Sequence, residues 1–243
     1  MDKKKILVFS GAGVSAESGI KTFRDAVNGL WYEYEIDEVA SISGWVKDKP
    51  KVLDFYNKRR RDMKLAEPND GHKLIAELEK HFDVTVVTQN VDDLHERAGS
   101  TDVVHLHGEL GKVRSTFDKN IVLDWDGDLN IGDKCSEGSQ LRPHIVWFGE
   151  ALDSGNLHYS QVKASEADVC IIVGSSMKVS PARDIPFLTN ETTLVYYVDP
   201  GDGEDMPYMS NTRRAFFYHH KENATIGMKQ VYDDLMNIFI NKK

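Results

Sequence analysis

The hydrophobic residues of this chain gather in short runs, and segments with helical spacing lie between the runs. Each run is rich in β-branched residues and is too short for a helix, which is typical of a strand buried on both faces of a parallel sheet. Strands that alternate with helices predict an α/β fold, a Rossmann-like doubly wound parallel sheet. The predicted strands are residues 6–9, 84–87, 169–173 and 194–198, with residues 103–106 as a fifth.

Two stretches interrupt this alternation. Residues 25–67 are aromatic and charged, with helical spacing and no strand signal, which predicts a helical insertion. Pro68, Asn69 and Asp70 then supply turn and capping chemistry for a helix expected to run to about His81. Residues 109–142 mix turn residues with short alternating pieces, which predicts a small lobe of short strands.

We therefore expect a single domain over residues 1–243. Its Rossmann core comprises about 1–24, 68–108 and 143–243, its helical insertion about 25–67, and its small lobe about 109–142. A chain of 243 residues with 40% hydrophobic residues is long enough to bury one core of this kind.

Charge and cysteine content exclude several classes of protein. The formal net charge is -9, which disfavours a nucleic-acid-binding surface. The two cysteines, Cys135 and Cys170, show no pairing pattern, which excludes a disulfide framework and favours a reducing compartment. No apolar stretch approaches the roughly 18 residues of a membrane span. We expect a cytoplasmic protein without a membrane partner, and its oligomeric state stays open.

Polar side chains follow two of the predicted strands. The second strand is followed by Gln89, Asn90 and Asp92, and the fifth is followed by His107. Ligands of parallel α/β proteins bind at the carboxyl edge of the sheet, where these residues would lie. His107 taken alone would more often be a partly exposed histidine than a catalyst. The cluster as a whole predicts a ligand site.

A glycine-rich turn follows the first predicted strand. Gly11 and Gly13 would let the backbone approach a phosphate closely, as in dinucleotide-binding turns. The third glycine of the usual fingerprint is Ala16, and the acidic residue expected about 20 residues further on is hard to place. A tight connection without a ligand is the alternative. The turn favours a nucleotide but is not a standard fingerprint for hydride transfer.

Together these segments resemble the sirtuins, which are NAD-dependent protein lysine deacylases. The resemblance covers about residues 5–235. Within the family, the chain resembles the subgroup that accepts succinyl- and malonyl-lysine. The matching motifs are Gly11-Ala12-Gly13-x-Ser15-x-x-Ser18-Gly19-Ile20-x-x-Phe23-Arg24, Thr88-Gln89-Asn90-x-Asp92-x-Leu94-His95-x-x-Ala98-Gly99, His107-Gly108, Val146-Trp147-Phe148-Gly149-Glu150, and Val173-Gly174-Ser175-Ser176 with Val179 and Pro181.

The resemblance implies NAD as cofactor and assigns a role to each cluster. The acyl oxygen would attack the ribose carbon as nicotinamide leaves. His107 would be the general base that relays a proton from the ribose hydroxyls, so that the 2′-oxygen can attack the acyl carbon. Asn90 and Asp92 would hold the nicotinamide carboxamide and share the catalytic step, and Gln89 would contact the nicotinamide ribose. The remaining cofactor contacts would come from Gly11, Ala12, Gly13, Ser15, Phe23, Arg24, Gly174, Ser175, Ser176 and Ala224. An acyl-lysine protein or peptide would pair with a strand edge formed by Val146, Trp147, Phe148 and Gly149.

The acyl group itself is indicated by two residues of the predicted insertion. Tyr56 and Arg59 are three residues apart and share one helix face. They resemble the pair that binds the acyl carboxylate in desuccinylating sirtuins, and Ala40 resembles the small residue that widens the same pocket. A guanidinium beside a phenol suits a carboxylate. The alternative is a solvated charge run from Arg59 to Arg61, and acetyl-lysine stays open as a second substrate.

The chain departs from the family in two places. Most sirtuins bind a structural zinc through two cysteine pairs, whereas residues 109–142 contain only Cys135, with Ser115 at the place of the first ligand. We predict no metal, and a lobe held by apolar contacts of Phe117, Val122, Leu123 and Trp125. At the adenosine end, Tyr197 is the apparent replacement for the usual asparagine, with Asp199 as another candidate.

Two other functions remain open from the sequence. An NAD hydrolase or ADP-ribosyl transferase could use the same scaffold, and a weak NAD-binding module is a third possibility. His107 and the segment from Val146 to Gly149 favour the deacylase.

Overall fold

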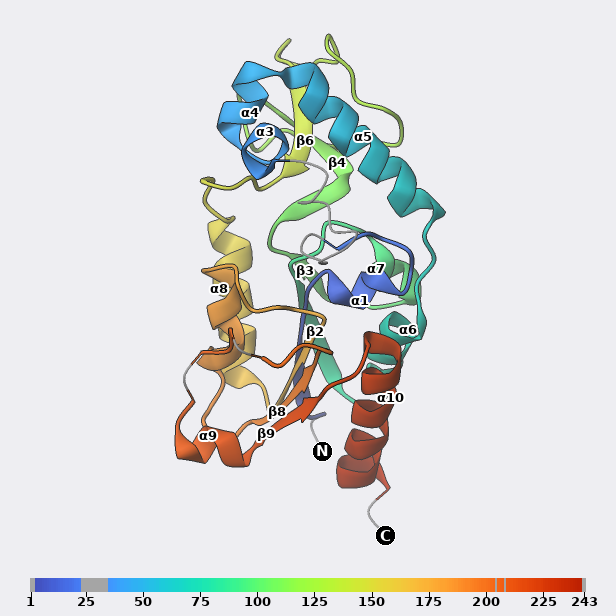
Figure 1. The fold of residues 1–243 in the computed structure, drawn as a ribbon, viewed down its shortest axis with the longest axis vertical. Helices are drawn as coiled ribbons and strands as arrows, with labels where there is room; N and C mark the ends of the chain where they lie inside the picture. Colours follow the sequence, from blue (N-terminus) through green and yellow to red (C-terminus); the bar gives the residue numbers. More distant parts are fainter. Residues whose placement is uncertain (1–2, 23–34, 204, 208, 242–243) are drawn as a thin grey trace.

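Six parallel strands form the larger sheet of the computed structural model, which describes residues 3–22, 35–203, 205–207 and 209–241. The strand order is β3-β2-β1-β7-β8-β9, and every neighbouring pair is parallel (Figure 1). From β1 the chain adds strands outward on one side and then returns to build the other side, as in dinucleotide-binding folds. The predicted Rossmann-like fold is confirmed. The strands are β1 Lys5–Ser10, β2 Asp83–Thr88, β3 Val103–His105, β7 Val169–Val173, β8 Leu194–Val198 and β9 Phe217–His220.

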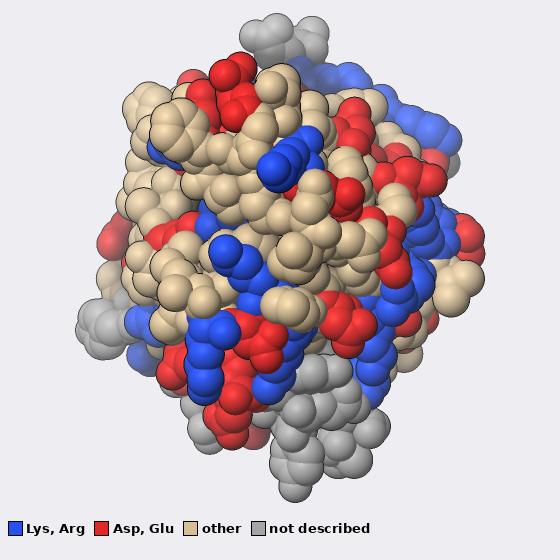
Figure 2. Space-filling view, turned by 90° about the horizontal axis from the view of Figure 1, so that it is seen from above, with Lys and Arg blue, Asp and Glu red and all other residues tan. Residues whose placement is uncertain are grey.

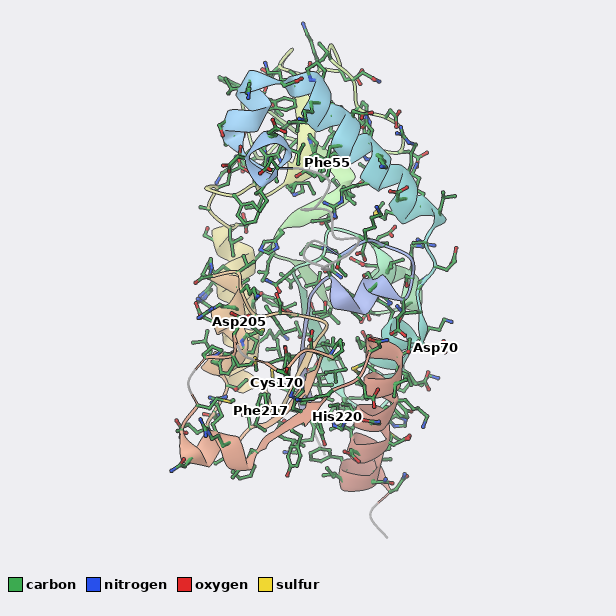
Figure 3. The ribbon with its side chains drawn as sticks, in the orientation of Figure 1. Phe55, Asp70, Cys170, Asp205, Phe217 and His220 are labelled. Carbon is green, nitrogen blue, oxygen red and sulfur yellow. The ribbon has the colours of Figure 1, made fainter. Side chains whose placement is uncertain are left out.

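Helices cover both faces of this sheet. On one face α6 and α10 pack on alternate strand residues such as Val8 and Val86, and on the other α8 and η1 pack on residues such as Leu7 and Cys170. The alternation follows from the period of two along a strand. Cys170 is fully buried in this part of the molecule (Figure 3). The helices of this half are α1 Gly13–Ala16, α6 Asp70–Leu78, α7 Leu94–Ala98, α8 Ser154–Glu166, η1 Ala182–Leu188, α9 Asn211–Ala215, α10 Ala224–Leu235 and the π-helix η2 Met236–Ile240.

The predicted helix after Pro68 is confirmed as α6. The Asn69 side chain caps it by accepting hydrogen bonds from the backbone of Gly71 and His72, at 2.9 and 3.4 Å. The helix ends at Leu78, three residues before the expected end, and a turn leads from there into β2.

A second, smaller sheet lies at the other end of the molecule (Figure 1). It has the antiparallel order β5-β4-β6, with β4 Gly108–Ser115, β5 Val122–Asp124 and β6 Leu141–Ile145. Three helices of the insertion pack against it and share its core: α3 Ile36–Val39, α4 Ile42–Lys47 and α5 Lys49–Leu65. Phe55 of α5 lies in this core (Figure 3).

The apolar contacts expected for the small lobe are partly wrong. Phe117 is 83% exposed and Leu123 is 41% exposed, while Trp125 packs on the shared core. The lobe instead contributes Leu110, Val113, Leu129, Leu141 and Ile145 to one core with α3–α5. These side chains come from β4, β6 and the connecting loop, so the lobe is stabilised by the insertion and not by contacts within residues 117–125.

Two buried polar side chains of α5 also hold the loop after β5. Asn57 donates to the Leu129 carbonyl at 3.0 Å and accepts from its amide at 2.9 Å. Arg60, which is 1% exposed, donates to the carbonyl of Leu110 at 2.7 Å and to Asn57 at 2.9 Å. Buried polar groups need such partners, so these bonds fix the lobe on the helix.

The surface at this end of the molecule carries both signs of charge. Figure 2 looks onto α3–α5 and the small sheet, and basic and acidic side chains are interspersed over the described residues seen there. Nucleic-acid binding would favour one continuous basic surface instead. Among the helices built from the described residues, none combines the length and the apolar character that crossing a membrane requires.

Candidate active site

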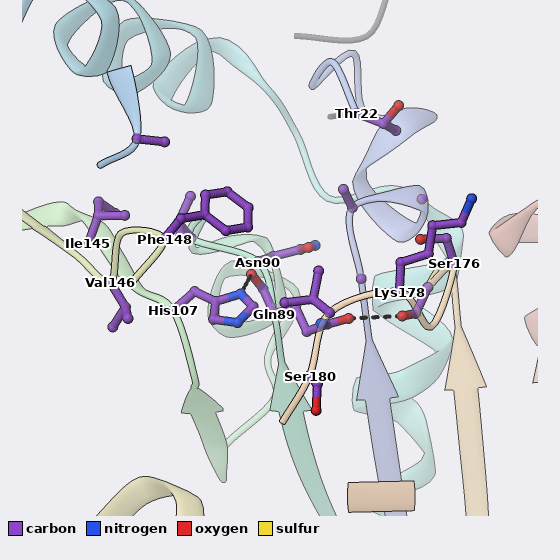
Figure 4. Close-up of a pocket in the computed structure, with 18 of the residues that line it drawn as sticks. Thr22, Gln89, Asn90, His107, Ile145, Val146, Phe148, Ser176, Lys178 and Ser180 are labelled. Atoms are coloured by element: carbon purple, nitrogen blue, oxygen red, sulfur yellow. Dashed lines mark hydrogen bonds between the residues drawn. The ribbon is translucent and has the colours of Figure 1, made fainter. Parts of the chain in front are cut away.

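The carboxyl ends of β1, β2, β7 and β8 open onto a cavity of about 1080 Å³ (Figure 4). The larger sheet supplies one side of its wall and the insertion and β6 supply the other. Polar strand ends that are far apart in the sequence therefore meet in one place, as the strand-end argument predicts. The proposed site residues on the wall are Gly11, Ala12, Gly13, Tyr56, Arg59, Gln89, Asn90, His107, Val146, Trp147, Phe148, Gly149, Gly174, Ser175, Ser176 and Ala224.

Two of the proposed site residues that the structure describes do not line this wall. Ser15 and Asp92 are buried, and they lie behind Asn90. Phe23 and Arg24 fall outside the described residues. Ser15 and Asp92 thus support Asn90 from behind in this structure, and their contact with a cofactor stays a prediction.

Three glycines let two loops cross at the end of the sheet. A Cβ at Gly11 would lie 2.7 Å from the Gly174 carbonyl oxygen, and one at Gly13 would lie 2.7 Å from the Gly174 Cα. The Gly13 amide donates to the Gly174 carbonyl at 2.8 Å. Gly174 itself has φ +60°, and a Cβ there would overlap the backbone nitrogen of Val14. The close approach of the two loops therefore requires glycine at these positions, whether or not a phosphate binds there.

We expect Gly174→Ala to lower the free energy of unfolding by at least about 2 kcal/mol, because it combines a left-handed backbone with overlap against backbone atoms. Denaturant unfolding followed by circular dichroism measures the change. Gly127→Ala is the matched control, since Gly127 is exposed and a Cβ there meets nothing within 4 Å. Equal stability of the two variants would contradict this account of the crossing.

His107 has the geometry of a general base. Its Nδ1 lies 3.0 Å from the Gln89 carbonyl oxygen (Figure 4). Because a carbonyl only accepts, Nδ1 carries the proton and Nε2 keeps its lone pair. Burial lowers the pKa of His107, and the bond to Gln89 opposes that shift in part. The imidazole is therefore neutral at neutral pH and able to take up a proton.

A chain of buried polar groups holds Asn90. The Asn90 amide donates to Ser15 Oγ at 3.0 Å, and Ser15 Oγ donates to Asp92 Oδ2 at 3.1 Å. His72 Nε2 lies 3.4 Å from the same hydroxyl, and burial lowers the pKa of His72 to about 4. Burial also raises the pKa of Asp92. The network fixes the orientation of the Asn90 side chain in the wall.

Gln89 connects three strand ends. Its side-chain oxygen accepts a hydrogen bond from Ser175 Oγ at 2.8 Å, while its carbonyl holds His107 (Figure 4). The end of β2, the loop after β7 and the segment after β3 are thereby joined around one residue. This arrangement makes Gln89 a positioning residue for His107 as well as a wall residue.

Tyr56 and Arg59 project from one face of α5 into the same cavity as His107. Tyr56 is 2% exposed, and burial raises its pKa to about 12, so its hydroxyl stays protonated. The Arg59 guanidinium lies 5.6 Å from the Phe55 ring centre. Burial lowers the pKa of Arg59, whereas Tyr56 and Asp92 raise it. The guanidinium nevertheless remains charged, as arginine does in proteins. Ala40 lies on the wall beside them.

At the end of the cavity expected for adenosine, Tyr197 is buried in the sheet and donates to the Ser175 carbonyl at 3.3 Å, so its side chain does not line the cavity. Asp199, the first residue after β8, lies on the cavity wall together with Lys178. Lys178 was missed because no motif marks it. The strand-end argument already indicates Asp199, since it follows a buried strand.

The segment after β6 does not continue as the predicted strand. The strand ends at Ile145, and beyond it Phe148 makes a single bridge to Ser41. The Val146 amide donates to the His107 carbonyl at 2.9 Å, which ties this segment to the His107 end of the cavity. Trp147 is 2% exposed and belongs to the core, whereas Phe148 is 44% exposed at the wall.

The small lobe does not fit the zinc site that the resemblance to sirtuins implies. Cys135 Sγ donates to Ser115 Oγ at 3.4 Å, so these two positions come together, but one thiol cannot supply a four-coordinate site. Within residues 3–22, 35–203, 205–207 and 209–241, no group of three or more His, Cys, Asp or Glu side chains is arranged to hold a metal ion.

We predict that the purified protein contains no stoichiometric zinc and that EDTA leaves its thermal midpoint unchanged, because metal binding at a structural site would add folding free energy. Elemental analysis and thermal melts with and without chelator measure both quantities. One zinc per chain, or a lower midpoint in EDTA, would overturn the prediction.

Comparison with known proteins shows which family shares this sequence and fold. The Sir2 family model matches residues 11–181. An NAD-dependent protein deacylase of Helicobacter pylori is 55% identical over 197 residues, which cover 81% of this chain and 85% of that protein. A protein of the same name from Bacteroides thetaiotaomicron is 46% identical over 234 residues, 94% and 96% of the two chains. A mutant Sir2 homologue in complex with ADP-ribose superposes with a TM-score of 0.88 at 35% identity, over 99% of this chain and 95% of that one.

The sheet order and the strand-end cavity define a dinucleotide-binding α/β domain. This chain belongs to the Sir2 family. NAD is its cofactor, and the cavity fits that molecule: side-chain-free glycines line the turn after β1, and the volume extends from Ala224 to His107.

Proposed function

We propose that this NAD-dependent protein deacylase acts best on lysines that carry an acidic acyl group, succinyl or malonyl. The observation that carries the proposal is the placement of Tyr56 and Arg59 in the same cavity as His107. Arg59 supplies charge, Tyr56 supplies a hydroxyl donor, and Ala40 leaves space beside them. Acetyl-lysine, which is smaller, can enter the same pocket.

The charge of Arg59 favours an anionic substrate. Burial makes its guanidinium less well solvated than a surface arginine, as the lowered pKa indicates. A carboxylate in the cavity would accept charge-assisted hydrogen bonds from Arg59, which are stronger than hydrogen bonds between neutral groups. An acetyl group has no carboxylate to accept them, so we expect the pocket to discriminate by charge as well as by size.

The cofactor end of the cavity would hold NAD through residues on three strand ends. Gly11, Ala12 and Gly13 would face the pyrophosphate, with Gly174, Ser175 and Ser176 opposite. Asn90 would hold the nicotinamide carboxamide, and Ser15 and Asp92 would keep it oriented. The adenosine would lie between Asp199 and Ala224. When bound, NAD supplies the ribose carbon that accepts the acyl oxygen as nicotinamide leaves.

His107 would manage the proton of the acyl-transfer step. Its neutral Nε2 can accept a proton from a ribose hydroxyl, while Nδ1 stays bound to the Gln89 carbonyl. The protein substrate would enter past the exposed ring of Phe148 and pair its backbone with the segment from Val146 to Gly149. Recognition through backbone and acyl-lysine fits the interspersed charges of Figure 2. We place this activity in the cytoplasm.

Product accounting tests this proposal against NAD hydrolysis and ADP-ribosyl transfer on the same scaffold. With a succinyl-lysine peptide, we expect one nicotinamide, one free lysine and one O-succinyl-ADP-ribose per NAD consumed. With no peptide, NAD should be stable. NAD loss at equal rates with and without peptide, or ADP-ribose attached to protein, would reject the deacylase.

A further inference from the structure

The hydroxyl of Tyr56 is held from behind by an indole. Trp147 Nε1 lies 2.9 Å from Tyr56 Oη, and both residues are buried. An indole N–H only donates, so the phenol oxygen must accept in this bond. Within the described residues this is the one hydrogen bond of Tyr56. Its own proton is therefore not used by Trp147 and is left for the cavity.

The indole is in turn fixed by an ion-pair cluster. The Arg142 guanidinium lies 3.3 Å from the Trp147 ring centre and donates to both carboxylate oxygens of Glu150, at 2.8 and 2.9 Å. Glu150 also accepts from the Trp147 backbone amide at 2.8 Å and from Arg114 at 3.0 Å. The same carboxylate thus anchors the backbone of Trp147 and the cation stacked on its ring.

We propose that Trp147 is a positioning residue that determines acyl specificity, because its N–H occupies the acceptor site of Tyr56 and directs the phenol proton at the acyl carboxylate. The inference rests on the proposed function. Without the indole N–H, the Tyr56 oxygen is free to accept from Arg59 or water, and its proton loses a fixed direction. An acetyl group has no carboxylate and makes no use of that proton.

Trp147→Phe tests the inference, since the smaller ring can still pack against Arg142 and Trp45 but cannot donate. We expect the succinyl-to-acetyl ratio of kcat/KM to fall about five- to tenfold, the loss of one buried hydrogen bond, mainly through a higher KM for the succinyl peptide. Tyr56→Phe should lower the ratio at least as much. The double variant should fall no further than Tyr56→Phe alone, because Trp147 acts through Tyr56.

The succinyl-to-acetyl ratio of kcat/KM is insensitive to partial unfolding, because inactive protein lowers both rates equally. If Trp147→Phe does not fold, 3-benzothienylalanine at position 147 gives the same comparison, because sulfur replaces the N–H in a ring of the same shape. An unchanged ratio, or single effects that multiply in the double variant, would overturn the role of Trp147. Failure of the proposed function is distinguishable, because then Arg59→Met also leaves the ratio unchanged.

Discussion

His107→Ala is expected to lower kcat/KM for an acyl-lysine peptide by about 10² to 10⁴, the range that a positioned general base contributes. The alanine removes the neutral imidazole, whose Nε2 is able to accept a proton at this end of the cavity. Initial rates with saturating NAD, followed by separation of the peptides, measure the loss. His81→Ala is the matched control, because His81 precedes β2. It therefore lies at the amino ends of the strands, whereas the cavity lies at their carboxyl ends. A His107→Ala variant within tenfold of the wild type would contradict the role.

The pH dependence of the wild type reports the same residue. Burial lowers the pKa of His107, so the ring stays neutral, and competent as a base, to a lower pH than an ordinary histidine. The acid limb of the kcat/KM profile should therefore be centred below about 6.5. A limb centred above that value would show that the protonation of His107 is not what limits activity in acid.

Arg59→Met carries the second large effect. Methionine keeps an unbranched apolar side chain but removes the charge, so kcat/KM for a succinyl-lysine peptide should fall about 10- to 100-fold, the loss of a charge-assisted hydrogen bond. The acetyl peptide should lose much less. Steady-state kinetics with both peptides on one sequence provide the comparison.

The chain offers a close control for this substitution. Arg61 lies on the same helix but is exposed and pairs with Asp128 at 2.6 Å. Arg61→Met should leave both activities near the wild-type values. Equal losses on the two peptides in Arg59→Met would indicate that Arg59 is a structural cation and that the charge run has no part in acyl recognition.

The sheet could be predicted from sequence because its strands are buried on both faces. Five apolar runs marked β1, β2, β3, β7 and β8, with β3 ending one residue earlier than expected. The edge strand β9, Phe217–His220, was missed, because a partly exposed strand needs no apolar run. Strand ends then marked most of the cavity wall, since a parallel sheet gathers them at one edge.

Tertiary contacts determine which polar side chains face the cavity and which apolar side chains are buried, and local sequence patterns do not show this. Asp92 and Asn90 are equally polar and two residues apart, yet only Asn90 faces the cavity, and Asp92 supports it through Ser15. Phe117 is apolar but exposed, because the core of the small lobe forms with α5 and not within the lobe. The Trp147–Tyr56 bond joins residues 91 positions apart, which no local pattern indicates.

We propose that Tyr56 and Arg59 make this Sir2-family cavity a site for acidic acyl groups. The most direct test is the kcat/KM of the wild-type protein for succinyl-, malonyl- and acetyl-lysine peptides of one sequence, with NAD, measured as nicotinamide release that matches free lysine. We expect kcat/KM for the succinyl peptide to exceed that for the acetyl peptide by at least about tenfold, the value of one charge-assisted interaction. Equal values, or a preference for acetyl-lysine, would contradict it.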